Sequence, residues 1–362
     1  MNAPKLGQAF TVKEIFDLIR DDLQRVEQEI STESIASVDI VTTIGRYLQS
    51  SGGKRLRPAL LLLSSKMVGD GGQSAIRLGA VVEIIHAATL LHDDVIDVAQ
   101  TRRGRPSTNV QWGNHNCVLA GDWLYMQAFQ MALRERNFRI LELLIGLTQM
   151  MVEGELLQLE RIGRMDLSEA DCMELVDRKT ACLFSVCARL GALVGGADSK
   201  TEEPQRRGQG ALTRRGAKSP IGENAKPTFA EEKLGEYAWN LGMAFQLVDD
   251  LLDFTASEKT LGKPVGNDLR EGKVTLPLVY ALERATEAER RQVENILKTK
   301  NYETVPFGNI LQMIERYGGV RRVRLRAEAF TQKARAIISE LPESPYQRAL
   351  YCIPDLVTDR DH

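Results

Sequence analysis

The sequence has little charge imbalance, no cysteine pattern and no long apolar run, and each absence excludes a class of protein. A total of 47 Lys and Arg residues against 49 Asp and Glu residues gives a net charge of −2. This balance provides no bulk attraction to nucleic acid, and leaves at most peripheral contact with a membrane. Apolar runs such as 59–63 are too short to cross a bilayer. Alternation of polar and apolar residues is nowhere sustained, so the sequence does not predict a β-sheet.

The cysteines point to a reducing compartment. The sequence contains 5 of them, an odd number, with no CxxC spacing, which argues against both disulfides and a zinc site. The first ten residues also lack the apolar core of a signal peptide. We therefore expect a cytoplasmic protein, and a length of 362 residues is compatible with one domain over 1–362.

Helical periodicity dominates the chain. Apolar residues recur at helical spacing over 11–31, where Thr11 and Glu14 form a predicted capping box, and again over 169–194. Only 199–229 departs from this pattern, because it is rich in Gly, Pro and charge and has almost no large apolar side chain. This composition predicts a flexible insertion in an otherwise all-α fold.

The most informative stretch is 81–105, in which an apolar helix ends in three aspartates, Asp93, Asp94 and Asp97. Their spacing puts Asp93 and Asp97 on one helical face. Two bare carboxylates about 4 Å apart repel by roughly 4 kcal/mol at an effective dielectric near 20, so a cation is expected beside them. Mg²⁺ is the obvious candidate, because it accepts carboxylate oxygen and keeps positions open for substrate phosphates.

A second acidic cluster repeats this arrangement. The segment FQLVDDLLDF places Asp249, Asp250 and Asp253 after another apolar helical stretch. A single cluster of this kind is often a solvated acidic surface. Two clusters that each end an apolar segment instead predict a pair of metal-binding motifs in one site.

Basic residues near these motifs predict an anionic ligand. Arginines after the first acidic cluster suit bidentate phosphate binding. The segment GGKRLRP offers two cations on one face, with glycines that allow close backbone approach. A lysine inside the apolar run near 180 is costly to bury without a partner. Each feature alone is common at protein surfaces, but together with the acidic motifs they predict a diphosphate site. These residues are Lys54, Arg57, Arg102, Arg103, Arg105 and Lys179.

Six segments in combination resemble the ordered motifs of the trans polyprenyl diphosphate synthases, in particular the long-chain members. The segments are GGKRLRP, LLHDDVIDVAQTRRGRP, GDWLY, DRKTACLF, FQLVDDLLDF and GKPVGNDLREGKVTLPL. The resemblance runs from about residue 35 to the end and departs from the family only at 199–229. It implies an isoprenoid-synthase helical bundle around a deep central cavity, usually a homodimer. It also implies condensation of isopentenyl diphosphate with an allylic diphosphate.

The resemblance assigns the acidic residues to metal binding. In the family pattern, Asp93, Asp97 and Asp249 hold the allylic diphosphate through Mg²⁺, with three ions in each site and Mn²⁺ as an alternative ion. The other acids of the two motifs support them. The implied metal set is Asp93, Asp94, Asp97, Asp249, Asp250 and Asp253.

The resemblance also assigns the residues that meet the two substrates. The leaving diphosphate faces Arg102, Lys179, Lys263 and Lys273, and the polar oxygens of Thr180 and Gln246 shield the allylic cation. No side-chain base stands out, so the released pyrophosphate is the implied proton acceptor. The implied site for isopentenyl diphosphate consists of Lys54, Arg57, His86 and Arg103.

Product length is predicted from Ala88 and Thr89, the residues five and four positions before Asp93. Short-chain relatives carry a bulky aromatic residue there as a cavity floor, so small residues predict a long product, C30 to C50, with C20 as the alternative. Two other activities are less consistent with the sequence. A terpene cyclase of the same fold normally has a different second metal motif, and a non-catalytic subunit should have lost one acidic motif.

Overall fold

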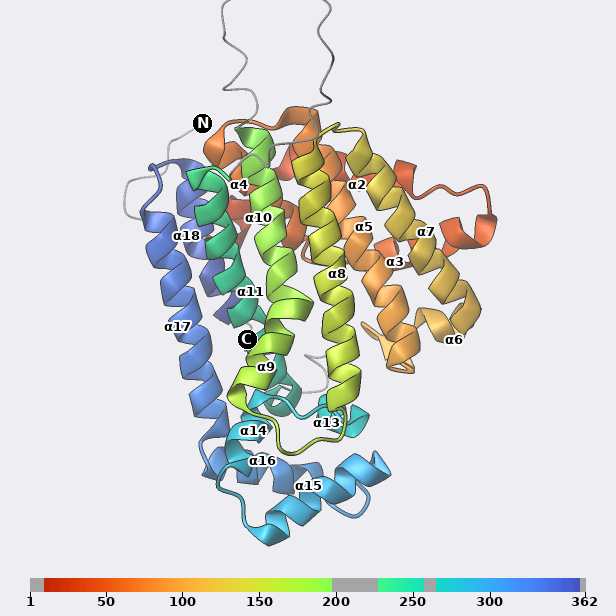
Figure 1. Cartoon of the computed structure of the whole chain (residues 1–362), viewed down its shortest axis with the longest axis vertical. Helices are drawn as coiled ribbons and strands as arrows, with labels where there is room; N and C mark the ends of the chain where they lie inside the picture. Colours follow the sequence, from red (N-terminus) through yellow and green to blue (C-terminus); the bar gives the residue numbers. More distant parts are fainter. Residues whose placement is uncertain (1–9, 197–226, 257–264, 359–362) are drawn as a thin grey trace, which may run out of the picture.

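The structure, a computed structural model, describes residues 10–196, 227–256 and 265–358. These segments form a bundle in which long helices run roughly side by side, with α15 and α16 gathered at one end (Figure 1). The described part contains one two-stranded hairpin and is otherwise helical, so the all-α prediction is confirmed. Residues 197–226, which include nearly all of the predicted insertion, and Lys263 lie outside the described ranges.

The elements are named here in their order along the chain. In order they are α1 (Val12–Asp17), α2 (Arg20–Glu33), α3 (Asp39–Ser50), α4 (Leu56–Val68), α5 (Gly72–Ile96), β1 (Thr101–Arg102), β2 (Arg105–Pro106), α6 (Thr108–Trp112), α7 (Asn114–Leu133), α8 (Phe138–Arg161), α9 (Glu169–Val176), the π-helix η1 (Asp177–Ala181), α10 (Cys182–Gly195), α11 (Phe229–Thr255), α13 (Asn267–Glu271), α14 (Leu276–Leu282), α15 (Glu287–Thr299), α16 (Phe307–Arg316), α17 (Gly319–Ser339) and α18 (Pro345–Thr358).

Two of the predicted helices are interrupted. The capping box of Thr11 and Glu14 is confirmed, but the helix predicted over 11–31 breaks at Leu18 and Ile19 into α1 and α2. The helix predicted over 169–194 contains the π-helix η1 between α9 and α10. A π-turn widens the helix locally and often marks a functional site.

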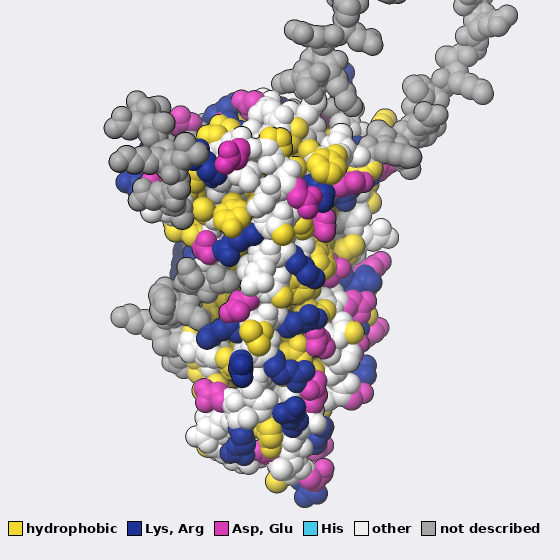
Figure 2. Space-filling model, turned by 90° about the vertical axis from the view of Figure 1, so that its left-hand side faces the viewer, with side chains coloured by type: hydrophobic (Ala, Val, Ile, Leu, Met, Phe, Trp, Pro, Cys, Tyr) yellow, Lys and Arg dark blue, Asp and Glu magenta, His cyan; other side chains and the backbone are white. Residues whose placement is uncertain are grey.

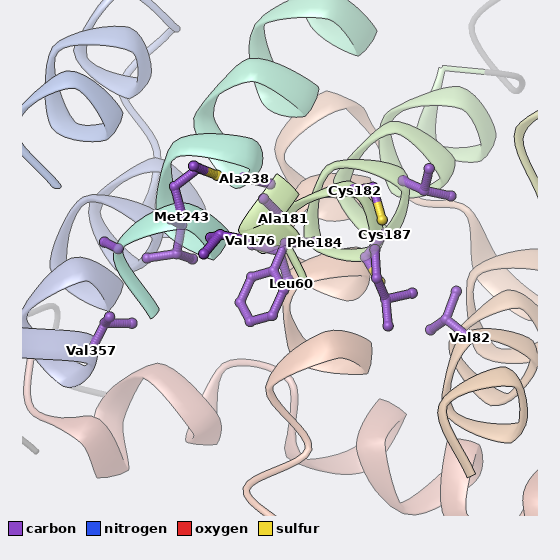
Figure 3. Close-up of a cluster of buried hydrophobic side chains, with 14 of the residues drawn as sticks. Leu60, Val82, Val176, Ala181, Cys182, Phe184, Cys187, Ala238, Met243 and Val357 are labelled. Carbon is purple, nitrogen blue, oxygen red and sulfur yellow. The ribbon is translucent and has the colours of Figure 1, made fainter. Parts of the chain in front are cut away.

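The described segments share one apolar core, with α10 at its centre. Figure 3 shows Phe184 of α10 among apolar side chains from several neighbouring helices, including Leu60 and Met243. Gly191 and Gly195 let α10 approach α4 closely, because a Cβ atom at these positions would lie 2.2 Å and 2.3 Å from backbone oxygens of α4. Such contact distances are too short for any larger residue.

Helix α5 carries the first acidic motif and lies inside the bundle. It is long and apolar enough to cross a membrane, which differs from the expectation drawn from short apolar runs, but 61% of its most apolar window is buried within the protein. It packs against α7, α4, α2 and α10. Its apolar character therefore reflects burial on most sides in a helical bundle.

The outer face that carries α17 has mixed charge. Figure 2 shows Lys and Arg side chains interspersed with Asp and Glu side chains on this face. Several arginines of α17 are paired with acids of neighbouring elements, as in the pairs Arg322–Glu283 and Arg326–Glu169. This mixture agrees with the near-zero net charge of the sequence.

Candidate functional site

The first acidic motif stands at the C-terminal end of α5. The helix ends at Ile96 with Asp97 as its C-cap, as the sequence predicts. Asp93 and Asp97 are half-buried, whereas Asp94 is fully buried. The aspartates thus face two different environments, although the sequence pattern presents them alike.

Asp94 is occupied by protein donors. Its Oδ1 accepts a hydrogen bond from Nε of Arg102 at 2.6 Å, and its Oδ2 accepts from the backbone N–H and the hydroxyl of Thr108 at 3.1 and 2.8 Å. These contacts tie the β1–β2 hairpin and α6 to α5. Asp94 and Arg102 therefore hold the loop after the motif in place. This agrees with the supporting position predicted for Asp94, whereas Arg102 has a structural contact that the sequence did not predict.

The surroundings of Asp93 disfavour its ionised carboxylate, which a bound cation would stabilise. Burial, together with the nearby carboxylates of Glu155 and Asp97, raises the pKa of Asp93 to about 7. Glu155 belongs to α8, on the other side of the site, and is paired with Lys179. The acids crowded around Asp93 are thus only partly neutralised by the protein's own cations.

The second acidic motif lies on α11 beside the residues predicted to shield the allylic cation. The hydroxyl of Thr180 donates to Oε1 of Gln246 at 2.7 Å, and Nε2 of Gln246 donates to Oδ1 of Asp250 at 2.9 Å. Burial raises the pKa of Asp250 well above its ordinary value, and the neighbouring carboxylate of Asp268 raises it further. The sequence prediction that Thr180 and Gln246 act in one place is consistent with this chain of hydrogen bonds.

The remaining acids of this motif have different surroundings. Asp253 is buried, and its Oδ2 accepts a hydrogen bond from the backbone N–H of Asp268 at 3.1 Å, which fixes the start of α13. Asp249 is half-buried and contributes to the raised pKa of Asp250. The carboxylates near Asp250 therefore come from both α11 and α13.

A cavity of about 170 Å³, here called the Asp250 cavity, joins these groups. Its polar lining comes from α8, η1, α11 and the α13–α14 region, and consists of Gln158, Arg161, Lys179, Gln246, Asp250, Asp268, Lys273 and Thr275. The π-helix delivers Lys179 to this wall, where its Nζ donates to Oε1 of Gln158 at 2.9 Å. Lys179 therefore contacts the carboxylate of Glu155 and also lines the Asp250 cavity.

Lys273 connects the two acidic motifs. Its Nζ lies 2.9 Å from Oδ1 of Asp97 and 2.8 Å from Oε2 of Glu271, and it also lines the Asp250 cavity. Burial lowers the pKa of Lys273, but the attraction of Asp97 and Glu271 outweighs it, so the net change is upward. Lys273 therefore links Asp97 at the end of α5 to the cavity that Asp250 of α11 lines.

A second cavity of about 390 Å³, here called the Lys54 cavity, contains the predicted isopentenyl diphosphate residues. Lys54, Arg57, His86 and Arg103 all line it. Burial lowers the pKa of His86 well below its ordinary value, and the surrounding arginines, Arg57 first among them, lower it further. His86 is thus a neutral hydrogen-bonding group in a strongly positive cavity.

Two aromatic residues form part of the wall of the Lys54 cavity. Phe184 and Phe245 line the Lys54 cavity, their ring centroids are 5.2 Å apart, and the Arg57 guanidinium lies 5.6 Å from the Phe184 centroid. Gln246, the residue after Phe245, lines the Asp250 cavity. The two cavities therefore take wall residues from consecutive positions of the same helix, α11.

The chain-length residues lie one turn before the first acidic motif. Ala88 is fully buried in the apolar core, whereas Thr89 is half-buried and its hydroxyl donates to the backbone oxygen of His86 at 2.7 Å. On α5, Thr89 shares the face of Asp93, and Ala88 is turned toward the core. Both positions are small, as the sequence predicts.

Several residues of the site were not predicted as site residues. Glu155, Gln158 and Asp268 stand among the predicted groups, and polar residues within the apolar helix of 140–162 were the available signal for the first two. Arg55 and Glu83 line the Lys54 cavity, but their pairing joins residues distant in sequence. No local pattern marks such a pair.

The donors fit a hard divalent cation that is shared with a phosphate ligand. Within the described ranges, no three His, Cys, Asp or Glu side chains are gathered closely enough to hold a metal ion alone. Asp93, Asp97 and Asp249 are half-buried and supply hard carboxylate oxygen donors. Mg²⁺ commonly binds through one or two carboxylates together with substrate phosphates and water, which is the donor set available here.

Comparisons with known proteins agree with this site. The polyprenyl synthetase family model matches residues 38–209 and 217–314. An octaprenyl diphosphate synthase of Haemophilus influenzae is 34% identical and covers 99% of this chain and 100% of its own length. A short chain isoprenyl diphosphate synthase of Methanothermobacter thermautotrophicus is 33% identical, with 96% and 99% covered.

A solved structure extends the similarity to the whole fold. The crystal structure of a polyprenyl synthase from Caulobacter crescentus, complexed with calcium and isoprenyl diphosphate, superposes with a TM-score of 0.85 at 31% identity. The alignment covers 99% of this chain and 100% of that protein. The chain therefore belongs to the polyprenyl synthetase family and is a polyprenyl diphosphate synthase, a prenyltransferase of isoprenoid biosynthesis.

Proposed function

We propose that the enzyme condenses isopentenyl diphosphate with an allylic diphosphate to make a long-chain all-trans polyprenyl diphosphate. The observation that carries the proposal is the pair of charged cavities to which α11 contributes consecutive residues, Phe245 and Gln246. Two diphosphates bound in these cavities would have their hydrocarbon parts near the same segment of α11. Proximity of this kind converts a bimolecular reaction into an effectively unimolecular one.

The Asp250 cavity is the proposed site of the allylic diphosphate. Lys179 and Lys273 are fixed positive charges on its wall, and Arg102 and Lys263 belong to the same proposed set. When the C–O bond of the allylic diphosphate breaks, negative charge builds on the leaving group, and preorganised cations stabilise it. The oxygens of Thr180 and Gln246, which are hydrogen-bonded to each other, would shield the allylic cation from capture by water.

Mg²⁺ is the proposed metal, with three ions in each site and Mn²⁺ as an alternative. When bound, it supplies Lewis-acid stabilisation of the leaving diphosphate. On the protein side, Asp93, Asp97 and Asp249 would provide the direct oxygen donors. Asp94, Asp250 and Asp253 would hold the geometry, since each already accepts hydrogen bonds from protein groups.

The Lys54 cavity is the proposed site of isopentenyl diphosphate. Lys54, Arg57 and Arg103 would bind its diphosphate, and neutral His86 would donate a hydrogen bond to it. After the C–O bond has broken, the double bond of isopentenyl diphosphate attacks the allylic cation and a new C–C bond forms. A proton is then lost next to the new cation, and the released pyrophosphate accepts it.

A long product, C30 to C50, is proposed from the absence of a bulky side chain at Ala88 and Thr89, with C20 as the alternative. Relatives that differ in product class are almost equally similar to this chain, so sequence identity does not decide product length. In our proposal, product length is decided by Ala88 and Thr89, beside which the growing hydrocarbon chain would pass. A terpene cyclase would leave isopentenyl diphosphate unused.

A homodimer is proposed from the exposed apolar residues of α7 and α8. They recur about every seven residues along each helix, which places them on one stripe of each. Large exposed apolar stripes mark contact surfaces. The residues are Val118, Leu119, Met126 and Leu133 on α7 and Ile145, Val152, Leu156 and Leu159 on α8. We further propose a cytoplasmic location with at most peripheral membrane contact and no nucleic-acid partner.

One incubation tests the proposed reaction. Purified protein is mixed with labelled isopentenyl diphosphate, an allylic primer and Mg²⁺, and the products are separated by chain length after dephosphorylation. We expect label in polyprenol of C30 to C50, and none when the metal is chelated. Hydrocarbon formed without consumption of isopentenyl diphosphate would favour a cyclase, and no turnover at all would favour a non-catalytic subunit.

A further inference from the structure

Arg55 occupies an unusual backbone position beside the Lys54 cavity. It is the residue before α4, and its backbone lies in the left-handed region, with φ of 47° and ψ of 35°. Non-glycine residues adopt this conformation at a cost and are held there by surrounding contacts. The conformation of Arg55 determines how Lys54 on one side and Arg57 on the other meet the cavity.

The side chain of Arg55 provides those contacts. Its Nη1 lies 2.9 Å from Oε1 of Glu83 on α5, and its Nε is paired with Glu27 on α2. Nη2 donates to Oε2 of Glu27 at 3.3 Å and reaches the backbone oxygen of Gln49 in α3 at 3.5 Å. One guanidinium thus joins the loop before α4 to three helices.

Arg55 also neutralises an acidic side chain of the Lys54 cavity, that of Glu83. Of the described residues that line the Lys54 cavity, Glu83 alone is acidic, and its side chain is 14% exposed. An uncompensated carboxylate at this wall would repel a diphosphate. Arg55 covers it, and Glu83 and Glu27 in turn keep the pKa of Arg55 raised although burial lowers it.

We infer that Arg55 is a positioning residue for the substrate of the Lys54 cavity, which acts by fixing the loop that carries Lys54 and Arg57 and by neutralising Glu83. The inference rests on the proposed assignment of this cavity to isopentenyl diphosphate. Arg55 does not itself bind the diphosphate, because its donors are directed to Glu27, Glu83 and the Gln49 carbonyl.

The test is steady-state kinetics of Arg55→Ala, Arg55→Lys and Arg55→Ala/Glu83→Gln, with folding checked by thermal unfolding. In Arg55→Ala we expect the KM for isopentenyl diphosphate to rise about 10- to 100-fold, the loss corresponding to charge-assisted hydrogen bonds. The KM for the allylic substrate should change far less. Lysine keeps the charge but cannot bridge two carboxylates, so Arg55→Lys should be intermediate.

The double variant separates positioning from direct binding. If Arg55 neutralises Glu83, removal of that carboxylate should restore part of the KM for isopentenyl diphosphate lost in Arg55→Ala. Equal KM values in the single and double variants would overturn the neutralising role. Arg55→Gly tests the backbone contribution, because glycine adopts the left-handed conformation freely; wild-type kinetics in this variant would overturn the role of the side chain.

Lys54→Ala distinguishes failure of this inference from failure of the proposed function. If Lys54→Ala raises the KM for isopentenyl diphosphate and Arg55→Ala leaves it unchanged, the cavity assignment holds and the inference about Arg55 is wrong. If Lys54→Ala leaves that KM unchanged as well, the cavity does not bind isopentenyl diphosphate and the proposed assignment fails first.

Discussion

Replacement of Asp93 by Asn is expected to stabilise the metal-free protein above neutral pH while it removes activity. Asp93 is half-buried, and burial raises its pKa from 3.8 to about 7 in the folded protein, with Glu155 and Asp97 as further contributors. The difference corresponds to about 4 kcal/mol of unfolding free energy, at about 1.36 kcal/mol for each pKa unit. This is the cost of holding the ionised carboxylate in a site from which its cation is missing.

The pH dependence follows from the direction of this change. Below the unfolded-state pKa of 3.8 the carboxyl is protonated in both states and contributes nothing. As the pH rises, the unfolded chain releases its proton first, so the folded state loses stability until about pH 7, where the loss is nearly complete. Asparagine has no proton to release, and the loss should disappear in Asp93→Asn.

The assay is guanidinium unfolding in the presence of a chelator, at about pH 5 and about pH 8. At the higher pH we expect Asp93→Asn to be about 2 to 4 kcal/mol more stable than wild type, with a smaller difference at the lower pH. Glu160→Gln, which removes an exposed carboxylate of the neighbouring helix α8, is the matched control and should change little. The reasoning is refuted if Asp93→Asn is no more stable than wild type at the higher pH.

Three further predictions concern product length, assembly and packing. Ala88→Phe should shift the product toward C15 or C20 in a chain-length assay, and unchanged product from an active variant would show that the hydrocarbon does not pass this part of α5. Met126→Glu, on a residue 64% exposed, should convert a dimer to a monomer in sedimentation analysis, whereas Glu287→Lys, on the exposed start of α15 and not on α7 or α8, should not. Gly191→Ala should lower stability by about 1 to 3 kcal/mol in chemical unfolding, because its Cβ would lie 2.2 Å from the Leu61 carbonyl oxygen; full stability would show that α4 and α10 separate readily.

Much of the fold was predictable from the sequence because helical periodicity and capping are local. The helix that carries Asp93 and Asp97 ends where the motif predicts, and the capping box of Thr11 and Glu14 forms as expected. The break at Ile19 was not predictable, because the apolar spacing continues through it and Ile19 is buried in the core like its apolar neighbours.

The site was predictable as a set of residues but not as a set of contacts. The motifs predicted that Lys54, Arg57 and His86 act together, and the three residues line one cavity. The sequence could not show that Asp94 is enclosed by protein donors whereas Asp93 is only half-buried, because both follow the same apolar helix. Pairings between distant segments, such as Lys273 with Asp97, depend on the tertiary fold and have no local signal.

The most direct test of two neighbouring diphosphate sites is the KM of each substrate in Lys54→Ala and Lys179→Ala. We predict that Lys54→Ala raises the KM for isopentenyl diphosphate about 10- to 100-fold and leaves that of the allylic diphosphate nearly unchanged. Lys179→Ala should instead impair the allylic substrate and the maximal rate, because it faces the Asp250 cavity. Equal effects of either substitution on both substrates would contradict the assignment of one substrate to each cavity.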